Sequence, residues 1–279
     1  MKKTALVLEG GGMRGIFTAG VLETLMEYDI YFDDVYAVSA GASTAVTYLS
    51  RQADRNRRVF IDYVTDPRYK GIKSFLTTGA YFNKKFIFET IPEVLDPFDY
   101  ETFFARTENL YIPLTNCVTG EVEYISDFKT KQDLKEVLDA ATSLPIMSRP
   151  VRHDGVYYLD GGVACPLVLD EVMKKGYDQI VYVLTQPKGY RKLQSEHSWL
   201  YPIVLRKYPK VIAKLNVRHA NYNRIITKIE SLEKQQKLIV VRPSDSFKVT
   251  RTESDPEKMK QGYDEGLAQG EYLYQKYFK

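Results

Sequence analysis

Cysteine and histidine are scarce in this sequence. Its 279 residues include only two cysteines and three histidines. Cys117 and Cys165 are too few for a disulfide framework. The histidines at 153, 197 and 219 are too scattered to form a metal-binding spacing with them. The sequence therefore indicates neither a disulfide-rich fold nor a metal site, and we expect no metal or organic cofactor.

A strong charge of one sign and a long apolar run are also missing. The formal net charge of +3 is too small to indicate nucleic-acid binding. No window approaches the ~20 apolar residues of a membrane span. The first apolar run is too short for a signal peptide, because Glu9 and a glycine cluster end it. The composition, 44% apolar and 27% charged, is that of a soluble globular protein, which we expect to be cytoplasmic.

The most informative stretch surrounds Ser39. An apolar run, residues 35–38, ends at this serine, and a helical pattern covers residues 43–49. Strand, sharp turn, serine and helix is the layout of a nucleophile elbow, whose helix N-terminus can stabilise developing negative charge. Gly41 is small enough for such a bend, whereas Ala37 stands where the usual pattern has a glycine. An ordinary strand-to-helix turn would show a similar pattern.

A glycine-rich loop follows the first predicted strand, residues 5–8. Gly10, Gly12 and Gly15 satisfy the G-x-G-x-x-G pattern of a dinucleotide-binding loop. That interpretation also expects an acidic residue at the end of the second strand, where this sequence has Ser39. Alternatively, the free backbone N–H groups of the loop hold an oxyanion beside the serine. Two consecutive strand–loop–helix units would place both loops at one edge of a parallel sheet.

The rest of the chain alternates between strand and helix patterns. The spacing of apolar residues and turn signals predicts helices over 16–28, 133–141, 166–175, 209–236 and 256–278, and strands over 110–118, 121–126, 156–159, 179–184 and 238–241. The first two of these strands form a hairpin through Thr119-Gly120.

Two segments allow more than one interpretation. The aromatic residues of 51–108, among them Phe75, Phe82 and Phe86, are either the core of a helical insertion or a cap that offers an apolar surface to an acyl chain. The helix at 209–236 has a polar face with basic residues, on which we place Arg218. Such a helix can rest on an anionic membrane, but a solvated outer face explains the same pattern.

Three motifs occur in one order along the chain: Gly10-Gly11-Gly12-Met13-Arg14-Gly15, Val38-Ser39-Ala40-Gly41-Ala42 and Asp160-Gly161-Gly162. Together they resemble the patatin-like phospholipases, a family of Ser-Asp lipid acyl hydrolases. The resemblance covers about residues 4–185. It implies a three-layer α/β/α fold on a mostly parallel sheet. Residues 1–190 would form the catalytic domain, with a helical insertion at about 51–108, and 191–279 a mainly helical extension packed on it.

The resemblance also implies a role for each motif. Ser39 would be the nucleophile and Asp160 its general base. The oxyanion hole would consist of the backbone N–H groups of Gly11, Gly12 and Met13, and the loops would be supported by Gly10, Arg14, Gly15, Gly41 and Gly161. The substrate would be a lipid carboxylic ester, such as a phospholipid or lysophospholipid, cleaved through an acyl-enzyme. Peripheral membrane contact is a further expectation.

Several alternatives remain open. Glu9 is harmless if it points away from the glycine loop, but it would oppose an oxyanion if it points inward. Ser43 is a rival nucleophile, one turn into the helix. A Ser-His-Asp triad would need His197 or His219. A lipid-binding or regulatory protein with the same fold and no turnover is the last alternative.

Overall fold

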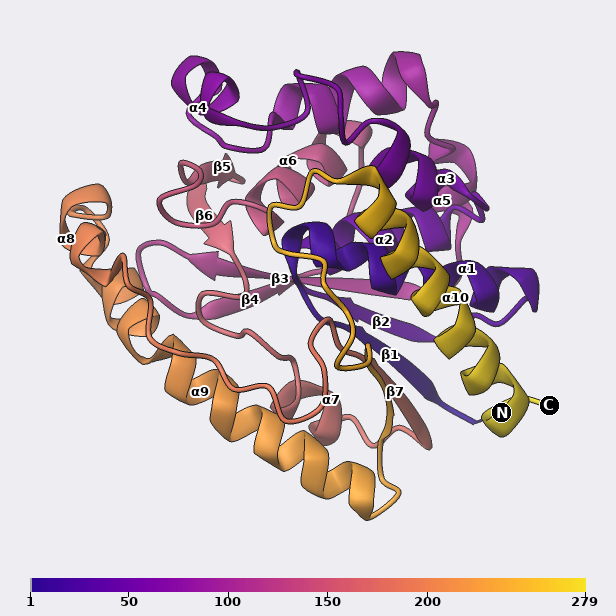
Figure 1. The fold of residues 1–279 in the computed structure, drawn as a ribbon. Helices are drawn as coiled ribbons and strands as arrows, with labels where there is room; N and C mark the ends of the chain where they lie inside the picture. The colour runs from indigo at the N-terminus through magenta and orange to yellow at the C-terminus, as the bar shows by residue number, and fades with distance from the viewer. Residues whose placement is uncertain (1) are drawn as a thin grey trace.

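The computed structural model describes residues 2–279, which form a mixed α/β fold (Figure 1). Within these residues, eight strands form one sheet in the order β5-β6-β3-β2-β1-β7-β8, and β4 pairs with β3. The strands are β1 (Thr4–Leu8), β2 (Asp34–Ala37), β3 (Asn109–Asn116), β4 (Val122–Ile125), β5 (Val151–His153), β6 (Val156–Asp160), β7 (Gln179–Val183) and β8 (Ile239–Val241). Strands β1, β2, β3, β7 and β8 are parallel. Strands β4, β5 and β6 pair antiparallel.

Helices cover both faces of this sheet. They are α1 (Gly15–Glu27), α2 (Ala40–Leu49), α3 (Arg55–Arg57), α4 (Ile72–Thr78), α5 (Tyr100–Ala105), α6 (Lys131–Ala141), α7 (Asp170–Lys174), α8 (Tyr201–Val204), α9 (Pro209–Lys234) and α10 (Pro256–Tyr277). The structure also contains two short 3₁₀ helices, η1 (Gly12–Arg14) and η4 (Ser198–Leu200). Two further segments are π-helical, η2 (Arg58–Asp62) and η3 (Phe86–Leu95). In residues 2–279, no helix has the length and apolar character needed to cross a membrane.

The alternation of side chains along β1 explains the three layers. Leu6 and Leu8 pack into a core shared with α1, α2 and α6. Ala5 and Val7 point to the opposite face, into a core shared with α7 and α9. Figure 1 shows α9 on one side of the sheet and α1, α2 and α10 on the other. The predicted three-layer α/β/α fold on a mostly parallel sheet is confirmed.

Helix α10 packs along α1, and the two helices run in the same direction. A Cβ atom on Gly266 would lie 2.2 Å from the carbonyl oxygen of Phe17, so only glycine allows this close approach. Further along, the rings of Tyr28 and Tyr274 stack with centroids 3.6 Å apart. The last helix therefore shields α1, which in turn follows the glycine loop.

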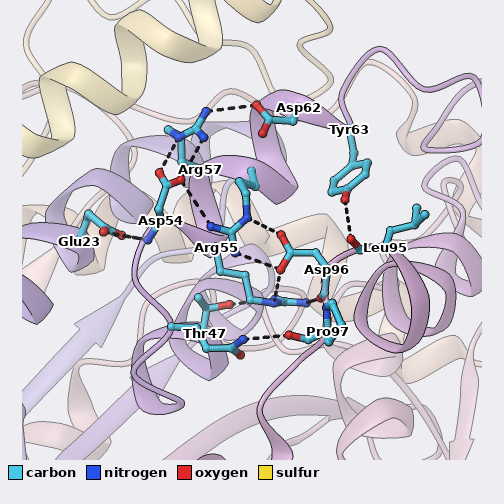
Figure 2. A network of polar contacts seen from close by, with 12 residues as sticks. Glu23, Thr47, Asp54, Arg55, Arg57, Asp62, Tyr63, Leu95, Asp96 and Pro97 are labelled. Atoms are coloured by element: carbon cyan, nitrogen blue, oxygen red, sulfur yellow. Dashed lines mark hydrogen bonds and ion pairs between the residues drawn. The ribbon is translucent and has the colours of Figure 1, made fainter.

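An ion-pair network anchors the segment 51–108 to α2 (Figure 2). The buried Arg55 donates from Nη2 to the carbonyl of Asp96 at 3.1 Å and from Nη1 to Thr47 Oγ1 at 3.3 Å. Arg58 Nε donates to Asp96 Oδ2 at 2.6 Å. The network fixes the short helices of this segment against the C-terminal part of α2, where Thr47 lies.

The structure corrects two details of the predicted helices. The helix expected over 166–175 begins only at Asp170, because the buried residues before it form a tight turn in which the Leu169 N–H donates to the Leu167 carbonyl at 3.0 Å. The predicted polar face of α9 is exposed at Lys210, Arg224, Lys228 and Lys234, but Arg218 points toward the carbonyl of Gly162 instead. Lys214 pairs with Glu121 at 3.0 Å, and a further lysine of this helix pairs with α7.

Candidate active site

Ser39 lies at the corner between β2 and α2. Its backbone has φ 55° and ψ −125°, a strained conformation for a residue with a side chain. The N–H of Gly41 donates to the carbonyl of Val38 at 2.8 Å and closes the turn. Neighbouring parallel strands β1 and β2 bring the glycine loop and this corner to the same edge of the sheet. The geometry is that of a nucleophile elbow.

Asp160 reaches this edge on an antiparallel strand. In the pairing of β2 with β3, Tyr36 lies opposite Tyr111, so β3 runs past the end of β2. Strand β6 returns along this extension, and Asp160 lies opposite Leu114, three residues beyond Tyr111. Ser39 is likewise three residues beyond Tyr36, which places Asp160 at the level of the serine.

Gly161 makes this arrangement sterically feasible. A Cβ atom at this position would lie 2.0 Å from the carbonyl oxygen of Pro113 on β3. The chain can therefore turn directly after Asp160 while its backbone contacts β3. The next residue, Gly162, donates its N–H to Asp160 Oδ1 at 2.7 Å and fixes the orientation of the carboxylate.

The carboxylate of Asp160 is buried, and only one of its two oxygens accepts a hydrogen bond. Its second oxygen, Oδ2, has no hydrogen-bond partner at standard distance among residues 2–279. Burial raises the pKa of Asp160, whereas interaction with the Ser39 side chain, the Gly162 N–H and the charges of Arg218 and Arg251 lower it. Asp160 is thus a desolvated carboxyl group with a free oxygen beside the serine.

The glycine loop lies against Ser39. A Cβ atom on Gly10 would be 2.6 Å from the Cβ of Ser39. The N–H groups of Gly11 and Gly12 donate to no acceptor within residues 2–279. In contrast, the Met13 N–H donates to the carbonyl of Arg251 at 3.0 Å. Two of the three donors expected for an oxyanion are therefore open, and the third is engaged.

Two other loop residues, Gly15 and Arg14, are those for which a supporting role is expected. Gly15 begins α1, and a Cβ atom added there would lie 3.3 Å from the Cβ of Ala40 in α2. Arg14 is half-buried at the end of η1, and burial lowers the pKa of its guanidinium while the charge of Glu9 raises it.

The side chain of Glu9 is held by two hydrogen bonds at the wall of the site. Its Oε2 accepts from the Thr185 N–H at 2.7 Å, and its Oε1 accepts from the Tyr222 hydroxyl at 2.9 Å. Both oxygens are therefore engaged with groups that follow β7 or lie on α9. This carboxylate is a structural link between the first strand and α9.

Lys192, Arg218 and Arg251 also reach the site, and the sequence prediction missed them. Arg218 Nε donates to the carbonyl of Gly162, next to Asp160. We expected Arg218 on the polar face of α9, but it lies between the buried Leu215 and Tyr222, three and four residues away along the same stripe. A lone arginine at an apolar position of the helical repeat was the available signal.

Two cavities meet at Ser39. The first holds about 700 Å³ of space, partly open to solvent, and is mainly apolar; it is lined among others by Met13, Phe60, Phe82, Phe88, Leu144 and Met147. The second, of about 370 Å³, is charged and contains Glu9, Arg14, Asp160, Lys192, Arg218 and Arg251. Phe82 and Phe88 thus face a cavity, whereas Phe86 is buried and Phe75 is exposed.

Of the other candidates from the sequence, Ser43 shares a cavity with Ser39, whereas the described histidines do not. Within residues 2–279, no histidine lines either cavity, so neither His197 nor His219 is placed to complete a triad. Ser43 lines the apolar cavity from within α2. Residues 2–279 contain no group of three or more His, Cys, Asp or Glu residues that could hold a metal ion.

We expect Asp160→Asn to stabilise the protein at pH 7. Burial raises the pKa of Asp160 in the folded state, so the folded state binds its proton more tightly than the unfolded state does. The free energy of unfolding therefore falls as the pH rises from the pKa of the carboxyl group in the unfolded state to its higher pKa in the folded state. Asparagine cannot ionise and so avoids this loss of stability. Thermal unfolding at pH 7 should show a rise of about 2 °C or more for the variant. The difference should shrink near pH 4; a variant less stable than wild type at pH 7 would show that the buried carboxylate does not destabilise the fold.

Comparison with known proteins gives relatives for much of the chain. A protein of Escherichia coli (strain K12), the uncharacterized protein YjjU, is 29% identical over 192 residues, which are 66% of this chain and 52% of that protein. The chain thus spans about half the length of this relative. The probable lipid hydrolase 463L of Invertebrate iridescent virus 6 is 24% identical over 219 residues, 70% of this chain and 73% of the viral protein.

The structure of VipD from Legionella pneumophila aligns over 99% of this chain and 67% of that chain, with 15% identity and a TM-score of 0.49. A family model described as a domain of unknown function (DUF6363) matches residues 208–279. The model of the patatin-like phospholipases matches residues 6–172, which include the glycine loop, Ser39 and Asp160. The chain belongs to the patatin-like phospholipase family.

Proposed function

We propose that this protein is a serine acyl hydrolase that cleaves lipid carboxylic esters. The observation that carries the proposal is the strained corner at Ser39, next to the buried Asp160 with its unpaired carboxylate oxygen. Backbone strain at a serine between a strand and a helix is typical of a nucleophile. Membership of the patatin-like phospholipases and the name of the viral relative, a probable lipid hydrolase, support lipid esters as the substrate class.

In the proposed reaction, Asp160 takes the hydroxyl proton as Ser39 Oγ attacks the ester carbonyl carbon. The alcohol then leaves with that proton, and the acyl group remains on Ser39. Water, deprotonated by Asp160, attacks the acyl-enzyme; the bond from the acyl carbon to Ser39 Oγ breaks, Asp160 returns the proton to Oγ, and the fatty acid is released. Both steps use the same two residues, so no histidine is needed between them.

The oxyanion formed in each step would be stabilised by the glycine loop. A carboxylate is a weak base toward a hydroxyl group, so much of the rate must come from donors to the oxyanion, each of which can contribute about 3–4 kcal/mol. We assign this role first to the open N–H groups of Gly11 and Gly12. The predicted contribution of Met13 requires its bond to the Arg251 carbonyl to open.

The apolar cavity is the proposed acyl site. It reaches Ser39 and extends under the segment 51–108, where Phe60, Phe82 and Phe88 line it. An apolar chain that enters it is removed from water at about 25 cal/mol per Å² of buried surface. This supports the interpretation of the segment 51–108 as a cap for an acyl chain.

We also propose that residues 1–190 form the catalytic domain and that 191–279 is an extension packed on it. Helix α10 of this extension lies along α1, and α9 covers the opposite face of the sheet. Both parts share one core, so we expect them to unfold together.

The proposal predicts that hydrolysis depends on both Ser39 and Asp160. With a short p-nitrophenyl ester, Ser39→Ala should lose at least about 10³-fold in kcat, because it removes the nucleophile. Asp160→Asn should lose a comparable factor while remaining folded by circular dichroism. Ser43→Ala is the matched control, which removes the neighbouring serine and should keep activity within a few-fold.

Two results would speak against this function. Turnover that survives Ser39→Ala would contradict the mechanism. A folded wild-type protein that binds lipid esters but hydrolyses none of a phospholipid and lysophospholipid panel would favour the alternative, a lipid-binding protein without turnover.

We propose in addition a peripheral membrane contact through α4 and α8. Ile72 and Leu76 on α4 are 76% and 78% exposed, and Ile203 on α8 is 68% exposed. Figure 1 shows both helices projecting from the body of the molecule.

The double variant Ile72→Ser/Leu76→Ser should reduce cosedimentation with phosphatidylcholine vesicles at least about tenfold. Lys73→Ser on the same helix is the control, and equal binding by the double variant would exclude α4 as the contact.

A further inference from the structure

Four cations line the charged cavity beside Ser39: Arg14, Lys192, Arg218 and Arg251. Within residues 2–279, none of the four forms an ion pair within 4.0 Å. The neighbouring Arg191, outside the cavity, pairs with Glu230 at 2.7 Å. Cations that converge without direct ion pairs are unusual, because each has a desolvation penalty that a partner in contact would offset.

The cavity carries an excess of positive charge even when its carboxylates are included. Glu9 and Asp160 also line it, so four cations face two anions. Both carboxylates already accept other hydrogen bonds, Glu9 from Thr185 and Tyr222, and Asp160 from Gly162. Desolvation, followed by the charges of Arg218 and Arg251, lowers the pKa of Lys192 to about 7. A bound anion would relieve this repulsion.

The arginines are held so that donors remain free. Arg218 Nε is fixed by the Gly162 carbonyl, which leaves its two terminal nitrogens for another acceptor. Arg14 Nε is buried and has no hydrogen-bond partner within residues 2–279. The Arg251 side chain packs against the glycine loop, where a Cβ on Gly12 would lie 2.8 Å from its Cγ. Planar guanidinium donors in this number suit the oxygens of a phosphate group.

We propose that this cavity binds a phosphomonoester on the alcohol side of the ester substrate, as in an acylglycerol phosphate. The inference rests on the proposed function, because the acyl chain in the apolar cavity directs the alcohol to the other side of Ser39. A phosphomonoester carries about −1.5 to −2 charges at pH 7, which matches the excess positive charge, whereas a zwitterionic phosphodiester is neutral overall.

Most of the cations that would select a phosphorylated head group come from the C-terminal part of the chain. Lys192, Arg218 and Arg251 all lie outside residues 6–172, the range matched by the family model. Arg218 and Arg251 fall within the match to the domain of unknown function, residues 208–279. In this proposal the C-terminal segment selects the head group of the substrate.

The test compares two esters that differ only in the phosphate, a monoacylglycerol and the acylglycerol phosphate of the same acyl chain. Wild-type protein should show kcat/KM at least about 10-fold higher for the phosphorylated ester. Arg251→Gln and Lys192→Gln should each lower this ratio by about 10-fold, mainly through KM, because each removes a charged hydrogen bond. Lys188→Gln, an exposed lysine of the same loop, removes equal charge and should keep the ratio.

A binding experiment separates this proposal from the proposed function. Folded Ser39→Ala should bind glycerol phosphate in calorimetry, and adding Arg251→Gln should weaken that binding at least about tenfold. Such binding would support the cavity assignment even if no ester were hydrolysed. Equal kcat/KM for the two esters, with Ser39-dependent turnover intact, would overturn this proposal alone. Binding of inorganic phosphate without preference for the phosphorylated ester would also overturn it, in favour of a free anion as the ligand.

Discussion

The burial of one carboxylate, that of Asp160, is the constraint on which the rest of the site depends. A desolvated carboxylate is a stronger base than one in water, but it destabilises the fold unless its surroundings compensate. Here β3 extends past β2, β6 returns along it, and Gly161 allows the backbone to contact Pro113. The Gly162 N–H then takes one carboxylate oxygen, and the other remains beside Ser39. Strain at Ser39 and burial of Asp160 both lower the stability of the fold, a cost that is typical of functional sites.

The C-terminal segment is part of the same construction. Helix α9 covers the face of the sheet opposite α1. Two side chains on its inner face contact the site: the Tyr222 hydroxyl donates to Glu9, and Arg218 donates to the carbonyl of Gly162. The chain before α10 places the Arg251 carbonyl on the Met13 N–H. The glycine loop and the loop after Asp160 are therefore both fixed from beyond residue 190, and the positive charges that accompany this support line the same cavity as Ser39.

The motifs that depend on local backbone geometry could be predicted from the sequence. Small residues at a sharp corner, as around Ser39, and Asp160-Gly161-Gly162 after a strand carry their signal within a few residues. Arg218 could not be found in this way, because an arginine in an amphipathic helix is assigned to solvent unless its register with Leu215 and Tyr222 is considered. The engagement of the Met13 N–H was equally hidden, since its acceptor, Arg251, is distant in sequence and supplies a backbone atom.

Covalent labelling tests most directly whether Ser39 is a nucleophile activated by Asp160. An alkyl fluorophosphonate should react with Ser39 Oγ, with loss of fluoride, and give one adduct that peptide mass spectrometry locates at this residue. We expect no adduct in Ser39→Ala and much slower labelling in Asp160→Asn. An adduct at Ser43 instead, or labelling of Ser39 that is equally fast without the Asp160 carboxylate, would contradict this assignment of roles.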